Sequence, residues 1–325
     1  MTKVNAFALA TLLAGTSLAS AHVGEGLEKH SKNQQHTMVS TSENEVKLCE
    51  FAPKNDLQIP EGLEQAGGID RATYDRALDK IEALYTKIVA DHGGVLKLNR
   101  MWSTAEVNSS ATRKGKSWIV NAYGGLARYK TMTYDGELMV LCHEMGHHLG
   151  GFPTYPGVLG GSWASNEGQS DYFATMKCFR RIIENDDNEA ILATMDVPSE
   201  VSKACQISYS SDKDIAICKR SSMTGKVLAQ VLYELGHSSA RSSEPDTPPA
   251  FDTPTSAEVS TTNNNHPLAQ CRLDTYFAGA ICSVSPMIEF SKSEGQTGAC
   301  NQELGDAFGF RPRCWYKPSR SDLFL

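Results

Sequence analysis

Long apolar runs, runs of basic residues and closely spaced cysteine pairs are all lacking in this sequence. No stretch of 18 or more uncharged apolar residues occurs, so we expect no transmembrane segment in the mature chain. The net charge is −7 and the lysines and arginines form no long run. A nucleic-acid partner is therefore not expected, because binding to phosphates requires a basic surface. No C-x-x-C pair is present, which argues against a zinc ribbon or a thiol redox site.

The composition that remains is that of an ordinary globular protein. Apolar residues make up 40% of the 325 residues and charged residues 21%. Internal repeats are absent, so a solenoid is not expected. The length allows one large domain or two modest ones.

The N-terminus has the features of an export signal. Lys3 precedes an apolar run over 6–18, and the small residues of 19–21 form an A-x-A cleavage site. We therefore expect a signal peptide over 1–21 and export to the periplasm or to the outside of the cell. Residues 22–60 are polar and weakly patterned, which predicts a loose N-terminal arm. A single domain over 61–325 would follow, with a flexible insertion at about 237–265 that is rich in Ser, Pro, Thr and Asn.

All nine cysteines follow the predicted signal peptide, and in an exported protein this number indicates disulfide bonds. Because nine is odd, at least one thiol is free, and Cys142, inside an apolar helical run, is the expected one. Local pairs are expected at 205/218 and 300/314. Cys271 and Cys282 are eleven residues apart on one predicted helix, about 16 Å, and so require other partners. The candidates for those partners are Cys49 and Cys178.

Apolar periodicity, caps and breakers predict a mixed α+β protein in which a small sheet precedes several helices. The predicted strands are 95–102, 106–112 and 117–128. The predicted helices are 70–91, 135–149, 166–183, 199–207, 223–235 and 267–282.

One motif carries recognisable chemistry. His143, Glu144 and His147 form H-E-x-x-H within the predicted helix 135–149. Residues four apart lie on one helix face, so both imidazoles can bind one Zn²⁺ ion. Glu144 lies one step round the helix, where it can act as the general base on a zinc-activated water.

A third ligand is predicted further along the chain. Pro153 stands where a metzincin would have its third ligand, and proline cannot bind a metal, so that class is excluded. Glu167 follows His147 by 20 residues, and two histidines with a glutamate are a known catalytic zinc set. Asp171, four residues later, can accept a hydrogen bond from a ligand imidazole and fix its tautomer.

These residues resemble the gluzincin metallopeptidases, with H-E-x-x-H at 143–147 and E-x-x-x-D at 167–171. The short spacing is similar to that of the thermolysin-like branch, in which a strand before the zinc helix carries an Asn-Ala pair that binds substrate backbone. Asn121-Ala122, with Tyr123, looks similar to that pair. His266-Pro267 followed by Arg272 resembles the H-P-x-x-x-x-R segment of the CAAX prenyl protease-like gluzincins. The two likenesses leave the branch open.

The resemblance implies a zincin-like core, in which a small sheet flanks the H-E-x-x-H helix, and a zinc-dependent endopeptidase acting on proteins or peptides. An extended substrate would then add to the strand at 117–125. His266 has two possible roles, as a donor to the oxyanion or as a fourth zinc ligand that blocks the site. Two rival interpretations of the whole chain are a metal-binding adhesin or interaction module without turnover, and a zinc amidase acting on a non-peptide substrate.

Overall fold

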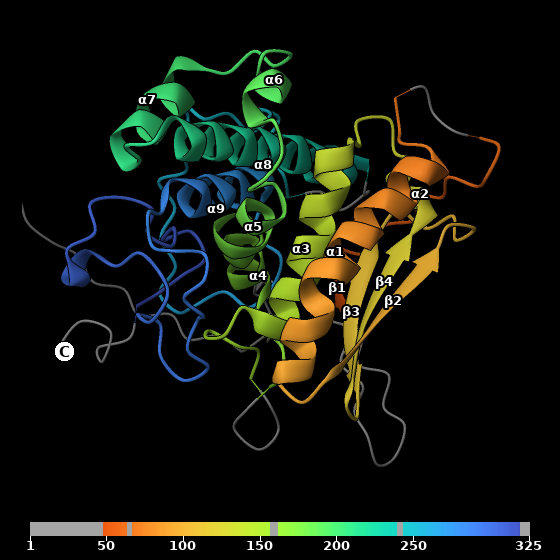
Figure 1. Cartoon of the computed structure of the whole chain (residues 1–325). Coiled ribbons are helices and arrows are strands. Elements are labelled where there is room, and N and C mark those ends of the chain that lie inside the picture. The colour runs from red at the N-terminus through yellow and green to blue at the C-terminus, as the bar shows by residue number, and fades with distance from the viewer. Residues whose placement is uncertain (1–47, 64–66, 157–161, 239–242, 319–325) are drawn as a thin grey trace, which may run out of the picture. The chain divides into compact units, whose positions relative to one another are not determined.

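A four-stranded sheet and a set of helices make up the computed structural model, which describes residues 48–63, 67–156, 162–238 and 243–318 (Figure 1). The signal peptide and most of the N-terminal arm predicted from the sequence lie outside these residues. None of the described helices is long and apolar enough to cross a membrane.

The sheet has the order β1-β3-β4-β2, and its strands are Cys49–Glu50, Val95–Met101, Ser109–Lys114 and Ser117–Tyr123 in chain order. β2 pairs with β4 in parallel, whereas β3 is antiparallel to both β4 and β1. Buried and half-buried residues alternate along β4, as expected for a strand with one face on the core. Its predicted end at 128 is too late, since residues 124–127 form the short helix α2 (Gly124–Ala127).

Two long helices pack close to the sheet. Asp70 caps α1 (Arg71–Asp91) as predicted, and its carboxylate accepts from the backbone N–H of Thr73. α3 (Tyr134–Leu149) begins one residue earlier than predicted, because the Thr133 hydroxyl caps it. α3 contacts the sheet, α1, α4 (Glu167–Phe173) and α8 (Asp212–Ser238) (Figure 1). Almost all of the side chains of α3 are buried.

The predicted helix over 166–183 is divided by a π-helical stretch. α4 (Glu167–Phe173) passes into the π-helical η1 (Ala174–Phe179) and then into α5 (Arg180–Ile182). Such wide turns are frequent at functional sites.

The rest of the described chain is helical or irregular. The remaining elements are α6 (Asn188–Leu192), α7 (Ser199–Ser208), α8 (Asp212–Ser238), α9 (Ala269–Ile281) and the 3₁₀ turn η2 (Gln302–Leu304). α8 is longer than expected, since the sequence predicted a helix only over 223–235.

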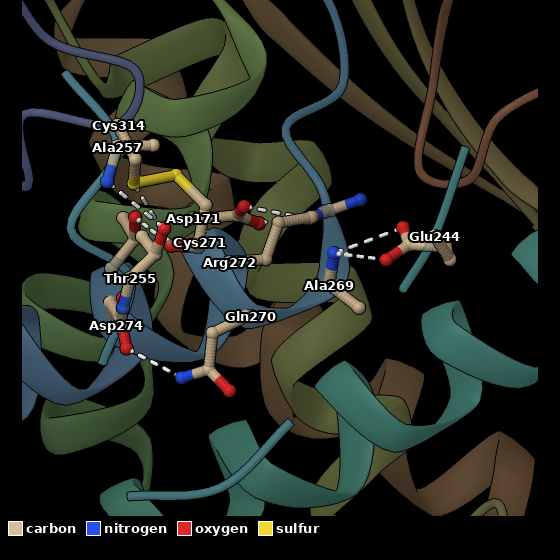
Figure 2. The surroundings of a disulfide bond; sticks show 11 residues. Asp171, Glu244, Thr255, Ala257, Ala269, Gln270, Cys271, Arg272, Asp274 and Cys314 are labelled. Carbon is tan, nitrogen blue, oxygen red and sulfur yellow. Dashed lines mark hydrogen bonds and ion pairs between the residues drawn. A yellow bond between two sulfur atoms is a disulfide. The ribbon is translucent and has the colours of Figure 1, made fainter. Parts of the chain in front are cut away.

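Four disulfides correct most of the predicted cysteine pairing. Cys205–Cys218 is confirmed. Cys142, predicted to be free, is bonded to Cys178, because α3 packs directly on η1 with the two Cα atoms 5.5 Å apart. The other pairs are Cys271–Cys314, seen in Figure 2, and Cys282–Cys300, so the predicted 300/314 pair is wrong. Cys49 takes part in none of these four disulfides and is buried.

Two segments expected to be loose make specific contacts. Cys49, Phe51 and Ala52, from the predicted arm, are fully buried next to β3. Residues 243–265, from the predicted insertion, form no helix or strand, yet they are tied to α9. The Glu244 carboxylate accepts from the backbone N–H of Ala269 at the start of α9 (Figure 2).

Candidate metal centre

Two elements bring the predicted ligands together. His143 and His147 lie one turn apart on α3, and Glu167 is the first residue of α4. One ligand atom from each of the three lies within 4.8 Å of the others, and all three side chains are fully buried. His143 Nε2 is 3.3 Å from Glu167 Oε2, and His147 Nε2 is 3.8 Å from Glu167 Oε1. This arrangement is compatible with a bound metal ion.

Close packing of α3 on α4 makes this geometry possible. A Cβ atom on Gly146, within the motif, would lie 2.8 Å from the Ser170 backbone, so only glycine fits there. Asn166 caps α4 by accepting from the backbone N–H of Gln169, which places Glu167 in the first turn. The glycine and the cap together bring Glu167 opposite the two histidines.

His143 is oriented by a buried ion pair. Its Nδ1 lies 2.7 Å from Asp171 Oδ1, and Arg272 donates to both Asp171 oxygens at 2.7 Å (Figure 2). The Tyr276 hydroxyl also donates to Asp171. Burial opposes ionisation of Asp171, but the charges of Arg272 and His143 keep its pKa below its ordinary value. A charged Asp171 holds the proton of His143 on Nδ1 and directs Nε2 toward Glu167.

His147 is oriented by different neighbours. Its Nδ1 lies 2.9 Å from the Ser165 carbonyl oxygen and 3.0 Å from the Ser170 hydroxyl. A carbonyl oxygen can only accept, so Nδ1 carries the proton and Nε2 presents its lone pair. Both histidines thus present Nε2 toward Glu167.

Several buried polar atoms at the centre lack a partner, which is compatible with a bound metal ion. His143 Nε2, Glu167 Oε2 and both carboxylate oxygens of Glu144 are buried without a hydrogen-bond partner. Unsatisfied buried polar atoms are rare in proteins, and a cluster of them requires an explanation such as an ion or a water. Burial raises the pKa of Glu144 well above its ordinary value, and the charge of Glu167 adds to this effect.

Glu167 is held by further side chains that surround its carboxylate. Tyr155, from the loop after α3, donates a hydrogen bond to Oε1, and His266 Nε2 lies 3.4 Å from Oε2. Burial alone would raise the pKa of Glu167, but His266, His147 and His143 together lower it well below its ordinary value. The ligand carboxylate is therefore ionised.

His266 reaches the cluster although it is distant in sequence. Its Nε2 lies 2.7 Å from the backbone carbonyl oxygen of Glu50. A nitrogen that donates to a carbonyl has no lone pair left for an ion. Of the two roles considered from the sequence, this geometry favours the hydrogen-bond donor.

The predicted substrate strand is placed differently from expectation. β4, which carries Asn121, Ala122 and Tyr123, lies between β2 and β3, so both of its edges are already paired. The expectation that a peptide adds to 117–125 is therefore wrong. The Asn121 side chain bonds to Asn99 and Ser110 within the sheet, and the Ala122 carbonyl accepts from a tyrosine of α1. The Tyr123 hydroxyl lies 3.1 Å from the Ser110 hydroxyl.

Sequence reasoning assigned no role to three residues of this centre, Tyr155, Arg272 and Tyr276. Arg272 was part of a recognised motif, and Tyr276 follows it by four residues on the same face of α9. That spacing was an available signal. Tyr155 comes from an irregular loop, and no pattern in the sequence marks it.

Comparison of the chain with protein-family models, with curated proteins and with solved structures found no match. The functional argument therefore depends on the arrangement of these side chains.

Proposed function

We propose that this protein is an exported, zinc-dependent metalloendopeptidase of the gluzincin type that hydrolyses peptide bonds. One observation carries the proposal: His143, His147 and Glu167 converge within 4.8 Å beside a fully buried glutamate that is not a ligand, Glu144. Two histidines, a glutamate and an adjacent general base are the parts of a catalytic zinc site.

Each residue of the centre has a separate role in the proposed reaction. Zinc, when bound by His143, His147 and Glu167, lowers the pKa of water to about 7 and polarises a carbonyl. Glu144 takes the proton from the attacking water and delivers it to the leaving amine. His266, whose Nε2 already donates to a carbonyl oxygen, stabilises the negative charge that develops on the scissile carbonyl.

The proposed location follows from the cysteines. Four disulfides are typical of proteins outside the reducing cytosol. We place the protein in the periplasm or outside the cell, with a protein or peptide as its substrate.

One observation favours a second candidate, a metal-binding module without turnover. All four central side chains, His143, Glu144, His147 and Glu167, are fully buried, whereas a catalytic site must admit substrate. Such a module would keep the ion and would not need Glu144.

Metal analysis and casein hydrolysis of the wild type and Glu144→Gln separate the two candidates. The variant removes the proton carrier and no ligand, so it should keep about one zinc per chain and lose at least ~10²-fold in activity. Equal activity of the variant and the wild type would refute the mechanism. Zinc binding without hydrolysis of any peptide or cell-wall amide in a broad panel would favour the non-catalytic module.

A further inference from the structure

The metal centre is covered by a segment of the chain's own N-terminal part. β1 and the two residues after it, 49–52, run along the edge of β3, which packs on α3. Cys49, at its start, belongs to the same buried cluster as Tyr155, whose hydroxyl bonds to the ligand Glu167. The segment therefore explains why a site proposed to act on peptides is closed.

Backbone geometry places one carbonyl of this segment at the cluster. Cys49 and Glu50 pair with Ala111 and Ser110 of β3, and the Phe51 N–H donates to the Ser109 carbonyl at 3.1 Å. Backbone groups of successive residues in a strand point to opposite sides, so the Glu50 carbonyl points away from β3. It accepts from His266 Nε2, the group proposed above to bind the scissile carbonyl.

The Phe51 side chain, next in the segment, packs against the proposed ligand His143. The Phe51 ring is fully buried, and its centroid lies 5.3 Å from that of His143. The Arg272 guanidinium lies over the Phe51 ring, 4.9 Å from the ring centroid. It also donates to the Phe51 carbonyl at 2.7 Å. Both the ring and the carbonyl of Phe51 are thus held in place beside the proposed metal ligands.

We propose that residues 49–52 are a built-in pseudo-substrate, which occupies the edge of β3 where an extended peptide pairs and keeps the enzyme inactive until it leaves. The inference rests on the proposed function. In this arrangement the Glu50 carbonyl takes the place of the scissile carbonyl, and Phe51 takes the place of the residue directly after the cleaved bond. Substrate peptides would pair antiparallel to β3.

The segment is held by contacts that a substitution can weaken. Asn108 accepts from the Ala52 N–H at 2.9 Å and donates to the Ala52 carbonyl at 3.2 Å. Within the part of the chain that the structure describes, the Asn108 side chain forms hydrogen bonds with Ala52 and Ser109 and with none of the proposed ligands. The two hydrogen bonds with Ala52 fasten the segment to the residue that precedes β3.

Asn108→Ala should release the segment. We expect its initial rate on a fluorogenic peptide with phenylalanine after the cleaved bond to rise at least ~5-fold over the wild type, with zinc content unchanged. Asn188→Ala is the matched control, because Asn188 is also buried and bonds backbone carbonyls, but on α6. The control should lose comparable thermal stability and gain no activity.

A disulfide should have the opposite effect. Cys49 and Ala111 are direct partners across an antiparallel pair, where the spacing of Cα atoms suits a disulfide. Oxidised Ala111→Cys should lose the remaining activity and regain it in a mild reductant that leaves the wild type unchanged. The titre of free thiols shows whether the bond has formed.

Binding separates this proposal from the proposed function. The probe is a labelled peptide of residues 48–53 with serine in place of Cys49, and its binding is followed by fluorescence polarisation. It should bind Asn108→Ala with or without Glu144→Gln, and not the oxidised Ala111→Cys variant. Binding without turnover in any variant would support the pseudo-substrate site and refute the peptidase. A different result would overturn only the pseudo-substrate proposal: the peptide does not bind, and neither Asn108→Ala nor oxidised Ala111→Cys changes the rate of hydrolysis. β1 would then be a purely structural strand.

Discussion

The two halves of α3 bury charge in different ways. In the second half, His143 and Glu167 face each other, and Asp171 behind them is matched by Arg272. In the first half, Glu137 is buried with one carboxylate oxygen that has no hydrogen-bond partner. Burial raises the pKa of Glu137 to about 8, whereas Asp171, equally buried, has a lowered pKa.

The two carboxylates differ in how the free-energy cost of burying a charge is avoided. At Asp171 a guanidinium and an imidazole supply opposite charge, so the group stays ionised and can orient a ligand. At Glu137 no cation lowers the pKa, and the group becomes neutral by holding its proton. Only the first solution supports metal chemistry, so substitutions in the two halves should have different consequences.

The largest contrast is expected between Glu167 and Glu137. Glu167→Ala removes a ligand, and two imidazoles alone hold zinc poorly, so zinc content should fall to near zero and activity by at least ~10²-fold. Glu137→Ala removes an equally buried glutamate and should leave about one zinc per chain. Metal analysis after dialysis measures both. Full zinc content in Glu167→Ala would show that the third ligand lies elsewhere.

His266→Ala tests whether the His266 imidazole donates to the oxyanion. As an oxyanion donor the imidazole should contribute ~2.7–4 kcal/mol to the transition state, so kcat should fall ~10²–10³-fold. Zinc affinity should change little. Steady-state kinetics of the zinc-loaded variant provide the measurement. An increase in activity together with a loss of zinc affinity would instead identify His266 as a blocking fourth ligand.

Asp171→Asn should have a smaller effect. The amide keeps the shape of the side chain but removes the charge that orients His143 and that Arg272 balances, so zinc affinity or activity should fall roughly 10–100-fold. Competition with a chelator gives the affinity. A wild-type value would mean that the Ser165 and Ser170 contacts of His147 are enough to organise the site.

Glu137→Gln should change only the pH dependence of stability. The folded-state pKa of about 8 exceeds the ordinary value of 4.5, so folding binds a proton between these pH values. This contribution is complete below pH 4.5 and is lost as pH rises toward 8, at no more than about 1.4 kcal/mol per pH unit. Denaturant titrations at pH 5, 7 and 9 should show a flatter profile for the variant. An unchanged profile would show that Glu137 is ionised in the fold.

Periodic patterns along the chain predicted most of the elements, because they depend on local spacing. The helices at 70–91 and 135–149 and the strand at 95–102 have nearly the predicted bounds, as caps and apolar positions recur at fixed intervals. The interruption of the helix at 166–183 and the added length of α8 depend on packing, which no local pattern records.

The sequence by itself determined that the imidazoles of His143 and His147 share one helix face, with Glu144 one step round the helix, since helix geometry places residues four apart together. It also indicated Glu167 and Asp171 by their spacing. Only the tertiary structure decided that Cys142 bonds to Cys178, that β4 has no free edge and that His266, Tyr155 and residues 49–52 meet at the cluster. These are contacts between segments far apart in the chain, which depend on how helices and strands pack rather than on the spacing within any one of them.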